Sequence, residues 1–482
     1  MIRNERQYRI TKSEADKFEQ AVSQLDHEVA ADTHPLLLKA QRDALLSQLA
    51  DLRADVEEYD ALKTGKRALL ELDSLADLPD ALVKARIAAG LSHKELADRL
   101  GMKEQQIQRY EASDYSGANL SRLIEIARAI GIDVQQSLFL PTSLDAGAEM
   151  SKRLKDIGFD QDFVRTRLLP RDAADRAEPA DIVFHTTAAL SRILGLTPAA
   201  LLGTQGPAID PSAYLAARFK VPASAEPKKL MAYTVYAHFL ALLLLEATDH
   251  LPQAEIPRDA ESLRRAVVDR FGELTLASVL RYAWHMGIPV LPLKDPGAFH
   301  AACWRVGGRN VIVLKQRAGS LGRWLFDLLH ELCHATEEPG NAEFQVIEGG
   351  LDAIGASSNP QPSELQANLF AGNVVLAGRA EELAQRAVEM TKKTAAEPGR
   401  LQLLKKAVLS LASQENVPVD ALANYLAYRL ALQGENWWGA AMNLQDTDDN
   451  PWSIARDVLL EQTRFHKLNS LDRRLLTQAL RE

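Results

Sequence analysis

The sequence has 482 residues, 46% of them hydrophobic and 25% charged, and a chain of this composition and length can build roughly two to four globular domains. The formal net charge of -9 excludes a protein that coats nucleic acid with its whole surface, although a small basic face can still bind DNA. There are only two cysteines, Cys303 and Cys333. They cannot form a disulfide framework, so we expect a cytoplasmic protein in a reducing environment.

No segment is expected to enter a membrane. Residues Met1 to Ile10 are polar and lack the apolar core of a secretion signal. The longest apolar stretch, Leu230 to Leu245, approaches the length of a membrane span, but it contains Thr234 and His238, and Glu246 follows directly. We therefore predict a buried helix there.

The N-terminal part is predicted to be helical. From Ile10 to Asp73, leucines and alanines recur at spacings of three and four residues, which predicts a helical hairpin that packs on the next domain or dimerises. Its stripe consists of Leu37, Leu38, Leu45, Leu46, Leu49 and Leu52. The chain restarts at Leu78-Pro79, and five further helical segments are expected as far as about Leu140.

The rest of the chain is predicted to be helical around one small sheet. Prolines punctuate residues Pro141 to Pro227, which we interpret as a helical connector with a helix stop and restart at Leu194 to Pro198. A helix is expected from Glu261 to His285, then a helix beginning near Ser320, and helices again from Ser363 to the end. Between the first two, three short strands are predicted at Ile288 to Leu293, Phe299 to Val306 and Asn310 to Gln316, with a hairpin turn at Gly307-Gly308.

These patterns predict a mainly α protein with one α+β domain that holds a sheet of about three strands. We expect five segments: a helical extension (1–74), a helix-turn-helix domain (75–140), a helical connector (141–260), an α+β domain (261–433) and a helical C-terminal segment (434–482).

A metal-binding pattern lies in the helix that begins near Ser320. His330 and His334 are four residues apart, so they share one helix face and can hold one metal ion. Glu331 can take a proton from the attacking water and pass it to a leaving amine. The alternative is a coincidental pair of histidines in a hydrophobic core.

A catalytic zinc ion needs a third protein ligand and one open position. Glu364 lies 30 residues beyond His334 and is the only carboxylate between Asp352 and Glu381. Spacing leaves two explanations open: Glu364 is that ligand, or it is a first-turn glutamate favoured by the helix dipole. Asn368, four residues further on the same face, could support a ligand histidine by accepting its ring N–H.

The residues around this pattern resemble the ImmA/IrrE family of zinc metallopeptidases. The resemblance rests on HELCHATEE, on the preceding strand pair AACWRVGGRNVIVLKQ and on ELQANLFA, and it extends over about Leu274 to Leu432. It implies a zincin-like peptidase domain with one Zn²⁺ per chain. The implied zinc ligands are His330, His334 and Glu364, and the implied catalytic base is Glu331.

The sequence departs from the family pattern at two positions. Cys333 stands where the family usually has glycine, and helical geometry turns it away from the two histidines, so we predict a packing residue. Gln366 stands where the family often has a second glutamate, so no other carboxylate near Glu364 could be the third zinc ligand. Oxyanion stabilisation has only weak candidates, each more easily explained as structural: His300, Arg305 and Tyr425.

A helix-turn-helix pattern occupies Asp80 to Ile132. Ser92 and Glu95 form a predicted capping box at the start of one helix, and Gly101 allows the tight turn before the next. Ala97 is small where two helices cross. The predicted core residues are Leu96, Leu100 and Ile107.

This segment resembles the XRE-type helix-turn-helix of phage repressors over about 55 residues, and the run that follows resembles antitoxin-like members of that group. The resemblance implies that a second helix, Lys103 to Ala112, meets double-stranded DNA. We expect Glu104, Gln105 and Arg109 to face base edges, and Lys103 and Gln106 to lie nearer phosphates. Lys84 to Arg109 contains six Lys or Arg against three Asp or Glu, a local charge of +3. The alternative is a helix-turn-helix that binds only protein.

The two resemblances together imply a zinc-dependent endopeptidase coupled to DNA-binding transcriptional regulation. We expect its substrate to be a repressor, a toxin-type partner or the chain itself, and its assembly to be a homodimer. The alternative is an antitoxin-like regulator whose peptidase fold senses or docks a partner without turnover.

Overall fold

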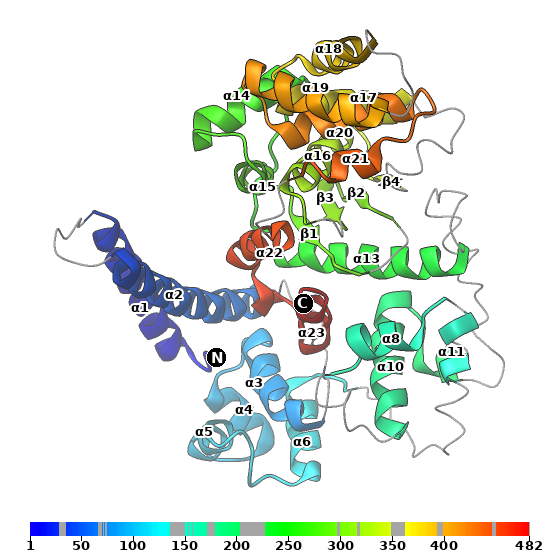
Figure 1. The fold of residues 1–482 in the computed structure, drawn as a ribbon. Coiled ribbons are helices and arrows are strands. Elements are labelled where there is room, and N and C mark those ends of the chain that lie inside the picture. Colours follow the sequence, from blue (N-terminus) through cyan, green and yellow to red (C-terminus); the bar gives the residue numbers. More distant parts are fainter. Residues whose placement is uncertain are drawn as a thin grey trace. The chain divides into compact units, whose positions relative to one another are not determined.

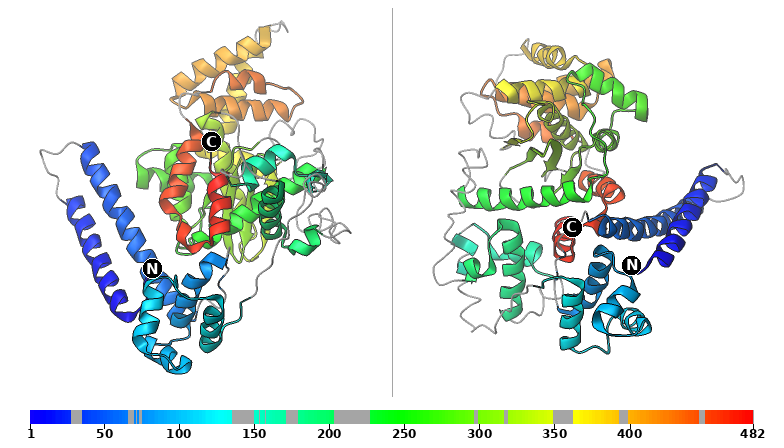
Figure 2. Two further views of the ribbon diagram at one scale, coloured as in Figure 1. Left: turned by 90° about the horizontal axis from the view of Figure 1, so that it is seen from below. Right: turned by 180° about the vertical axis from the view of Figure 1, so that it is seen from behind.

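The protein was studied as a computed structural model, shown in Figures 1 and 2. It describes residues 1–27, 35–65, 70, 72, 75–134, 150–152, 154–156, 158–170, 179–202, 227–295, 299–315, 319–348, 362–392, 399–445 and 450–481. Two compact units are present, Met1–Leu140 and Pro141–Glu482. The five segments expected from the sequence fall within these two units, and their separate boundaries stay predictions.

The first unit begins with a helical hairpin. Helices α1 (Glu5–His27) and α2 (Pro35–Lys63) pack along each other, as the leucine and alanine spacing predicts. Tyr8 of α1 stacks on Tyr59 of α2 with ring centroids 4.9 Å apart. At its base the hairpin shares a core with the helices that follow, so the predicted packing on the next domain is confirmed. The side chains of Leu37 and Leu38 lie outside the described residues.

Four helices and one short turn follow in this unit, up to residue 134: η1 (Leu75–Asp77), α3 (Leu78–Ala88), α4 (His93–Leu100), α5 (Glu104–Ala112) and α6 (Leu120–Ile130). A fifth predicted helix would fall on residues outside the description. The predicted capping box of α4 is confirmed, since Ser92 and Glu95 bond reciprocally. Gly101 ends α4 in the left-handed conformation, with φ of 65°.

A buried ion pair joins α3 to α5. The Arg86 guanidinium donates to both carboxylate oxygens of Glu111, at 2.6 and 2.8 Å, and both side chains are almost fully buried. The same guanidinium donates to the backbone carbonyls of Leu91 and Arg3. Because breaking a buried pair leaves an uncompensated charge, this contact fixes α5 against the rest of the unit.

Early in the second unit lie α8 (Gln161–Phe163), the π-helical turn η2 (Val164–Leu168), α10 (Pro179–Leu194) and α11 (Pro198–Leu202). The predicted stop and restart between Leu194 and Pro198 is confirmed. Next comes α13 (Pro227–Ala247), whose described side chains are mostly buried in the core, as predicted. In the part of the chain that the structure describes, no helix is long and apolar enough to cross a membrane.

The helix expected from Glu261 to His285 is in fact two helices, α14 (Ala260–Phe271) and α15 (Leu276–His285). Gly272 ends the first with φ of +81°, a conformation that favours glycine. The Thr275 side chain then caps the second. The prediction of one helix was wrong because the apolar spacing continues across this stop signal.

Within the described residues the sheet has four strands in the order β1-β3-β2-β4: β1 (Val290–Pro292), β2 (Ala301–Val306), β3 (Arg309–Leu314) and β4 (Phe344–Glu348). β1 pairs parallel to β3, and the other pairs are antiparallel. Gly307 and Gly308 both have positive φ and form the predicted hairpin turn. The expectation of about three strands missed β4, which follows the next helix in sequence and is held by its pairing with β2.

Alternate residues of the sheet face two different cores, as the two-residue period of a strand requires. Cys303 and Ile312 pack with the core that contains α16 (Leu321–His334), whereas Trp304 and Val313 pack with the core that contains α13. Figure 1 and the right panel of Figure 2 show the sheet between these two helices. The sheet therefore covers one side of α16 with buried residues.

The remaining helices complete the unit: α17 (Pro362–Val375), α18 (Ala380–Lys392), α19 (Arg400–Glu415), α20 (Val419–Ala431), α21 (Trp438–Met442), α22 (Pro451–Gln462), η5 (Phe465–Lys467) and α23 (Ser470–Ala479). Of these, α17 and α20 pack directly on α16, whereas η5 and α23 pack on α13. The C-terminal tryptophans Trp437, Trp438 and Trp452 are buried in the same core as α16. The C-terminal segment thus contributes to the structure that surrounds this helix.

We expect Gly372→Ala to lower the free energy of unfolding of the second unit by about 1–3 kcal/mol, because it overpacks a filled core. A Cβ atom at Gly372 of α17 would lie 2.4 Å from Cδ2 of the Tyr425 ring on α20. Urea denaturation followed by tryptophan fluorescence measures this unit, since all six tryptophans lie in it.

The control is Gly439→Ala in α21, where a Cβ atom would meet no described atom within 4 Å. This variant should match the wild type or exceed it slightly. An equal loss of stability in both variants would contradict the close approach of α17 and α20.

Candidate metal centre and nucleic-acid interface

Helix α16 presents two buried histidines on one face. The Ser320 side chain caps its first turn, and the leucines Leu328, Leu329 and Leu332 pack into the core. His330 and His334 lie one turn apart with ring centroids 4.7 Å apart, and both are almost fully buried. Apolar packing of the rest of the helix therefore holds both rings in place.

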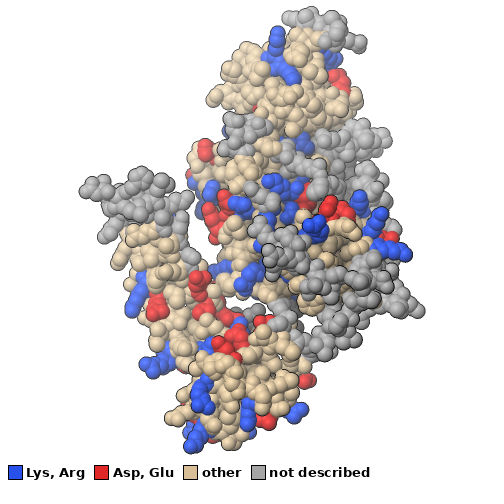
Figure 3. All heavy atoms as spheres, turned by 60° about the horizontal axis from the view of Figure 1, so that its bottom comes forward, with Lys and Arg blue, Asp and Glu red and all other residues tan. Residues whose placement is uncertain are grey.

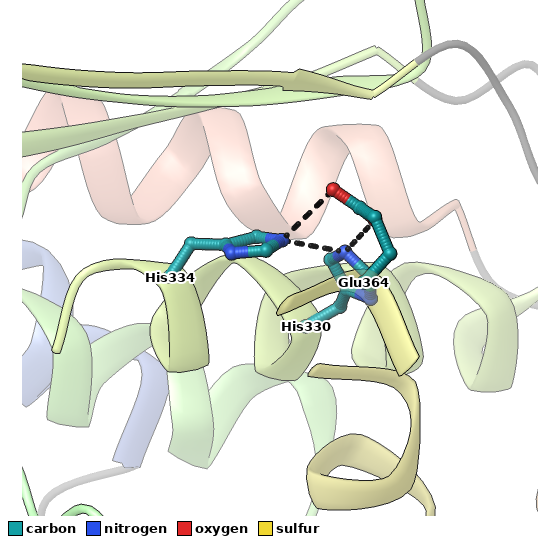
Figure 4. A group of neighbouring side chains, drawn as sticks. All are labelled: His330, His334 and Glu364. Carbon is teal, nitrogen blue, oxygen red and sulfur yellow. Dashed lines mark hydrogen bonds and ion pairs between the residues drawn. The ribbon is translucent and has the colours of Figure 1, made fainter. Parts of the chain in front are cut away.

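A carboxylate from α17 meets these rings. Glu364 lies in the first turn of α17, which packs against α16. Its two oxygens lie 3.2 Å from Nε2 of His330 and 3.5 Å from Nε2 of His334. The two Nε2 atoms are 3.0 Å apart. Figure 4 shows the three side chains pointing toward one another.

The spacing of these donor atoms fits a zinc ion. Two ligands of a tetrahedral zinc with bonds of about 2.0–2.1 Å are separated by about 3.3 Å. The three observed separations, from 3.0 to 3.5 Å, bracket that value. Two imidazoles and one carboxylate are also a common donor set for zinc in hydrolytic enzymes.

The electrostatics of the cluster reflect its close packing. Burial disfavours the charged form of His334, but hydrogen bonds to Glu337 and Glu364 outweigh it and raise its pKa to about 10. Burial likewise opposes ionisation of Glu364, yet the hydrogen bonds from His330 and His334 hold its pKa well below the usual range. Glu364 thus stabilises the protonated form of His334, and the two histidines stabilise the ionised form of Glu364.

Glu331 and Cys333 lie on the same helix but outside this convergence. Glu331 is fully buried beside His330. Burial, with the charges of Glu337 and Glu331, raises the pKa of the Cys333 thiol to about 12, so it stays protonated. Since a thiol binds metal as the thiolate, this agrees with the packing role predicted for Cys333.

Two contacts near the cluster differ from the sequence prediction. Asn368 donates its amide to the backbone carbonyl of Glu364 at 2.8 Å, one turn back on its own helix. Its support of a ligand histidine stays a prediction. The His334 ring is instead contacted by Glu337, whose carboxylate lies 2.7 Å from Nδ1 of His334. Glu337 was missed, although its position three residues after His334, at the end of the helix, could have indicated it.

The oxyanion candidates have structural partners. Arg305 donates to four backbone carbonyls in the turn after α16. Tyr425 bonds to Glu381, and the His300 carbonyl accepts from Lys315. Tyr428, one turn beyond Tyr425, was not considered. Burial and the nearby charges of Glu364 and Glu381 raise the pKa of the Tyr428 hydroxyl to about 12, although the charge of Arg429 opposes this. The effect of Glu364 indicates that the ring lies near the cluster.

The predicted DNA-facing residues lie together on α5 and its N-cap. All five side chains are exposed: Lys103, Glu104, Gln105, Gln106 and Arg109. Two already have local partners, because Gln106 accepts from the Lys103 backbone N–H at 3.1 Å and Glu104 accepts from Gln108 at 2.9 Å. Gln105 and Arg109 lie one turn apart on the exposed face.

The local charge of +3 overstates the basic surface near α5. Arg86 is buried against Glu111, and Lys84 is paired with Glu58 and Asp80. Lys94, Arg99, Lys103 and Arg109 remain exposed in this segment. Figure 3 shows Lys and Arg side chains interspersed with Asp and Glu over the coloured part of the visible face.

Two families match separate parts of the chain. Residues 82–136 match a family described as Helix-turn-helix, and residues 285–401 match one described as IrrE N-terminal-like domain. The first match includes α5, and the second includes His330, His334 and Glu364. None of the curated proteins and none of the solved structures with which the chain was compared matches it. Residues 82–136 are therefore an XRE-type helix-turn-helix domain, and residues 285–401 are a domain of the ImmA/IrrE-like peptidase family.

Proposed function

We propose that the chain is a zinc-dependent endopeptidase coupled to DNA-binding transcriptional regulation, which cleaves a repressor, another partner protein or itself. The observation that carries this proposal is the convergence of His330, His334 and Glu364 within a domain of a peptidase family. Their donor atoms lie within 4.8 Å of one another. Location in the cytoplasm and assembly as a homodimer remain predictions from the sequence.

In this proposal the three converging side chains hold one zinc ion through His330 Nε2, His334 Nε2 and a carboxylate oxygen of Glu364. A bound zinc ion would polarise the peptide carbonyl and lower the pKa of water. Two histidines and one carboxylate leave a fourth position open for reactants. Glu364 is partly exposed, with 26% of its side-chain surface accessible, so the open position would be reached from its side of the cluster.

Glu331 would act as the general base in this site. Its carboxylate would accept a proton from the attacking water and pass it to the leaving amine. It is fully buried, as are the neighbouring leucines Leu328, Leu329 and Leu332. Burial of this kind excludes bulk water and strengthens the interaction of Glu331 with developing charge.

For the first unit we propose that α5 lies in the major groove of double-stranded DNA. Arg109 and Gln105 would meet base edges, and Lys103 would lie near a phosphate. Glu104 and Gln106 are kept as DNA-facing residues with smaller expected effects, because their side chains bond within α5 and its cap. The buried contact of Arg86 with Glu111 supports this assignment, since it keeps the helix rigid.

The alternative function is an antitoxin-like DNA-binding regulator whose peptidase fold senses or docks a partner without turnover. In this alternative the helix-turn-helix domain would bind DNA in the same way. The two proposals make different demands on Glu331, which a docking protein would not need.

The purified chain is expected to hold about one zinc ion, and His330→Ala or His334→Ala should abolish this binding. Glu364→Ala should weaken it by roughly ten-fold or more, because two histidines alone hold zinc poorly. Metal analysis after dialysis and a competition titration with a chelating dye measure both effects. The exposed neighbour Gln366→Ala is the control on α17 and should bind like the wild type. Full occupancy in both histidine variants would show that the site is elsewhere.

Glu331→Gln should keep the zinc and the fold and lower peptide cleavage by about 10²- to 10⁴-fold, the contribution of a positioned general base. Glutamine is nearly isosteric but cannot accept the proton. Cleavage is measured on a fluorogenic peptide library of random sequence and on the full chain itself. Equal regulation of a reporter gene by Glu331→Gln and wild type, with loss only in His334→Ala, would favour the docking alternative over the peptidase.

Arg109→Ala should weaken binding to a selected DNA site by about 1–3 kcal/mol and relax the preference at one base pair, if Arg109 reads a guanine. Lys103→Ala should weaken binding to all sequences and reduce the salt slope by about one. Gel shifts of the full chain on duplexes selected from a random pool measure both. Arg128→Ala, exposed on α6, is the control. Absence of any DNA binding by the wild type at low salt would leave the protein-binding alternative.

A further inference from the structure

The turn after α16 is held from the sheet by one buried arginine. Arg305 of β2 is 4% exposed, and its guanidinium donates to the carbonyls of Ala335 at 2.8 Å, Glu337 at 2.9 Å and Glu338 at 2.7 Å. Asn310, its partner across the β2–β3 hairpin, accepts from Arg305 Nε and donates to the Ala335 carbonyl at 3.1 Å. These contacts satisfy the carbonyl of Ala335, the C-cap of α16, and the carbonyls of the turn that follows it.

This turn places a carboxylate on the outer nitrogen of a candidate zinc ligand. Glu337 Oε1 lies 2.7 Å from His334 Nδ1, while His334 Nε2 faces His330 and Glu364. An ionised carboxylate can only accept a hydrogen bond, so in the neutral imidazole, which is the form that binds metal, it selects the tautomer with the proton on Nδ1. That tautomer leaves the Nε2 lone pair directed at the position where the donor atoms converge.

Glu337 stands where a carboxylate is otherwise unfavourable. It follows the C-terminus of α16, where the helix dipole disfavours negative charge. Its backbone carbonyl is bonded to Arg305, and its backbone N–H donates to the His334 carbonyl at 3.0 Å. The backbone around Glu337 is therefore fixed. The contact with His334 offsets the unfavourable position of the Glu337 carboxylate near the helix C-terminus.

We infer that Glu337 is a positioning residue for the metal centre, and that Arg305 and Asn310 set its position from the sheet. This inference rests on the proposed zinc site. Glu337 orients the His334 ring and increases the basicity of Nε2, as carboxylates bonded to metal-ligating histidines do. It is not itself a ligand, because its carboxylate lies on the Nδ1 side of the ring.

The test is the zinc affinity of the full chain, measured by competition with a chelating dye. Glu337→Ala should weaken zinc binding by about 10- to 100-fold. Glu337→Gln should weaken zinc binding less than Glu337→Ala, because its amide oxygen still accepts the hydrogen bond from the ring N–H, although it carries no charge. Unfolding in excess chelator measures the stability that the contact contributes without metal, and the loss of zinc affinity of the folded chain is expected in addition to it. A purely structural role would instead lower stability in chelator and leave the affinity of the folded chain unchanged, which would overturn the inference.

The matched control is Glu338→Ala. This residue is adjacent and exposed, and its carboxylate accepts from Asn341 at 2.6 Å. The substitution removes the same charge at nearly the same place, so wild-type affinity is expected. An equal loss in Glu338→Ala would assign the effect to general charge and overturn the inference. If the wild type itself binds no zinc, the proposed function fails, whereas a zinc-binding wild type matched by Glu337→Ala overturns only the positioning role.

The contribution of the sheet is tested by Asn310→Ala, which loosens the turn without removing a buried charge. It should weaken zinc binding in the wild-type background and add little in the Glu337→Ala background, because both changes act through the same contact. Cobalt substitution gives a second readout, since the visible spectrum of bound Co²⁺ should change in Asn310→Ala and Glu337→Ala and not in Glu338→Ala. Independent, additive losses of zinc affinity would separate Asn310 from Glu337 and overturn the proposed connection.

Discussion

Burial of α16 between the sheet and the helices around α17 is the constraint on which the second unit depends. A helix that carries two histidines and a glutamate on buried positions is costly unless those groups have partners. The leucines on the same helix provide the apolar contact that holds it in the core. The two histidines then meet Glu364 and Glu337 at the margin of that core. The site is thus a polar edge of a hydrophobic structure.

The order of elements along the chain explains why so much of the unit takes part. The two histidines are on one helix, Glu364 is on the next helix, and the residues that hold the intervening turn come from β2 and β3. Helices α19 to α22 then complete the core around α16, including the buried tryptophans near the C-terminus. A segment with no chemistry of its own is therefore still required for the geometry of the centre.

Local chemistry could be predicted from the sequence. The four-residue spacing of His330 and His334, the reciprocal bonds of Ser92 and Glu95, and the turn at Gly307-Gly308 each depend on a few neighbouring residues. These features recur in the structure. Glu364 was located only with the help of a family resemblance, because thirty intervening residues leave its distance from His334 open.

Features that depend on distant partners were missed. β4 forms because β2 is available to pair with it, and its five residues alone give no strong indication of a strand. Arg86 was counted as surface charge, although Glu111 holds it in the core. Arg305 was expected to be structural, and it is, but the sequence did not indicate its partners, which are four backbone carbonyls after α16 and Asn310. A sequence pattern gives the type of a side chain but not the groups that will surround it.

The three converging donor atoms come from two successive helices, α16 and α17, and this arrangement affects how long the folded unit survives. If the proposed zinc site is correct, an ion shared by α16 and α17 would act as a cross-link that closes a chain loop of 30 residues between His334 and Glu364. In a loop-closure treatment a covalent link across such a loop is worth about 3–4 kcal/mol at most, through the entropy of the unfolded chain. Metal supply would then govern how long the protein survives proteolysis in the cell as well as whether it is active.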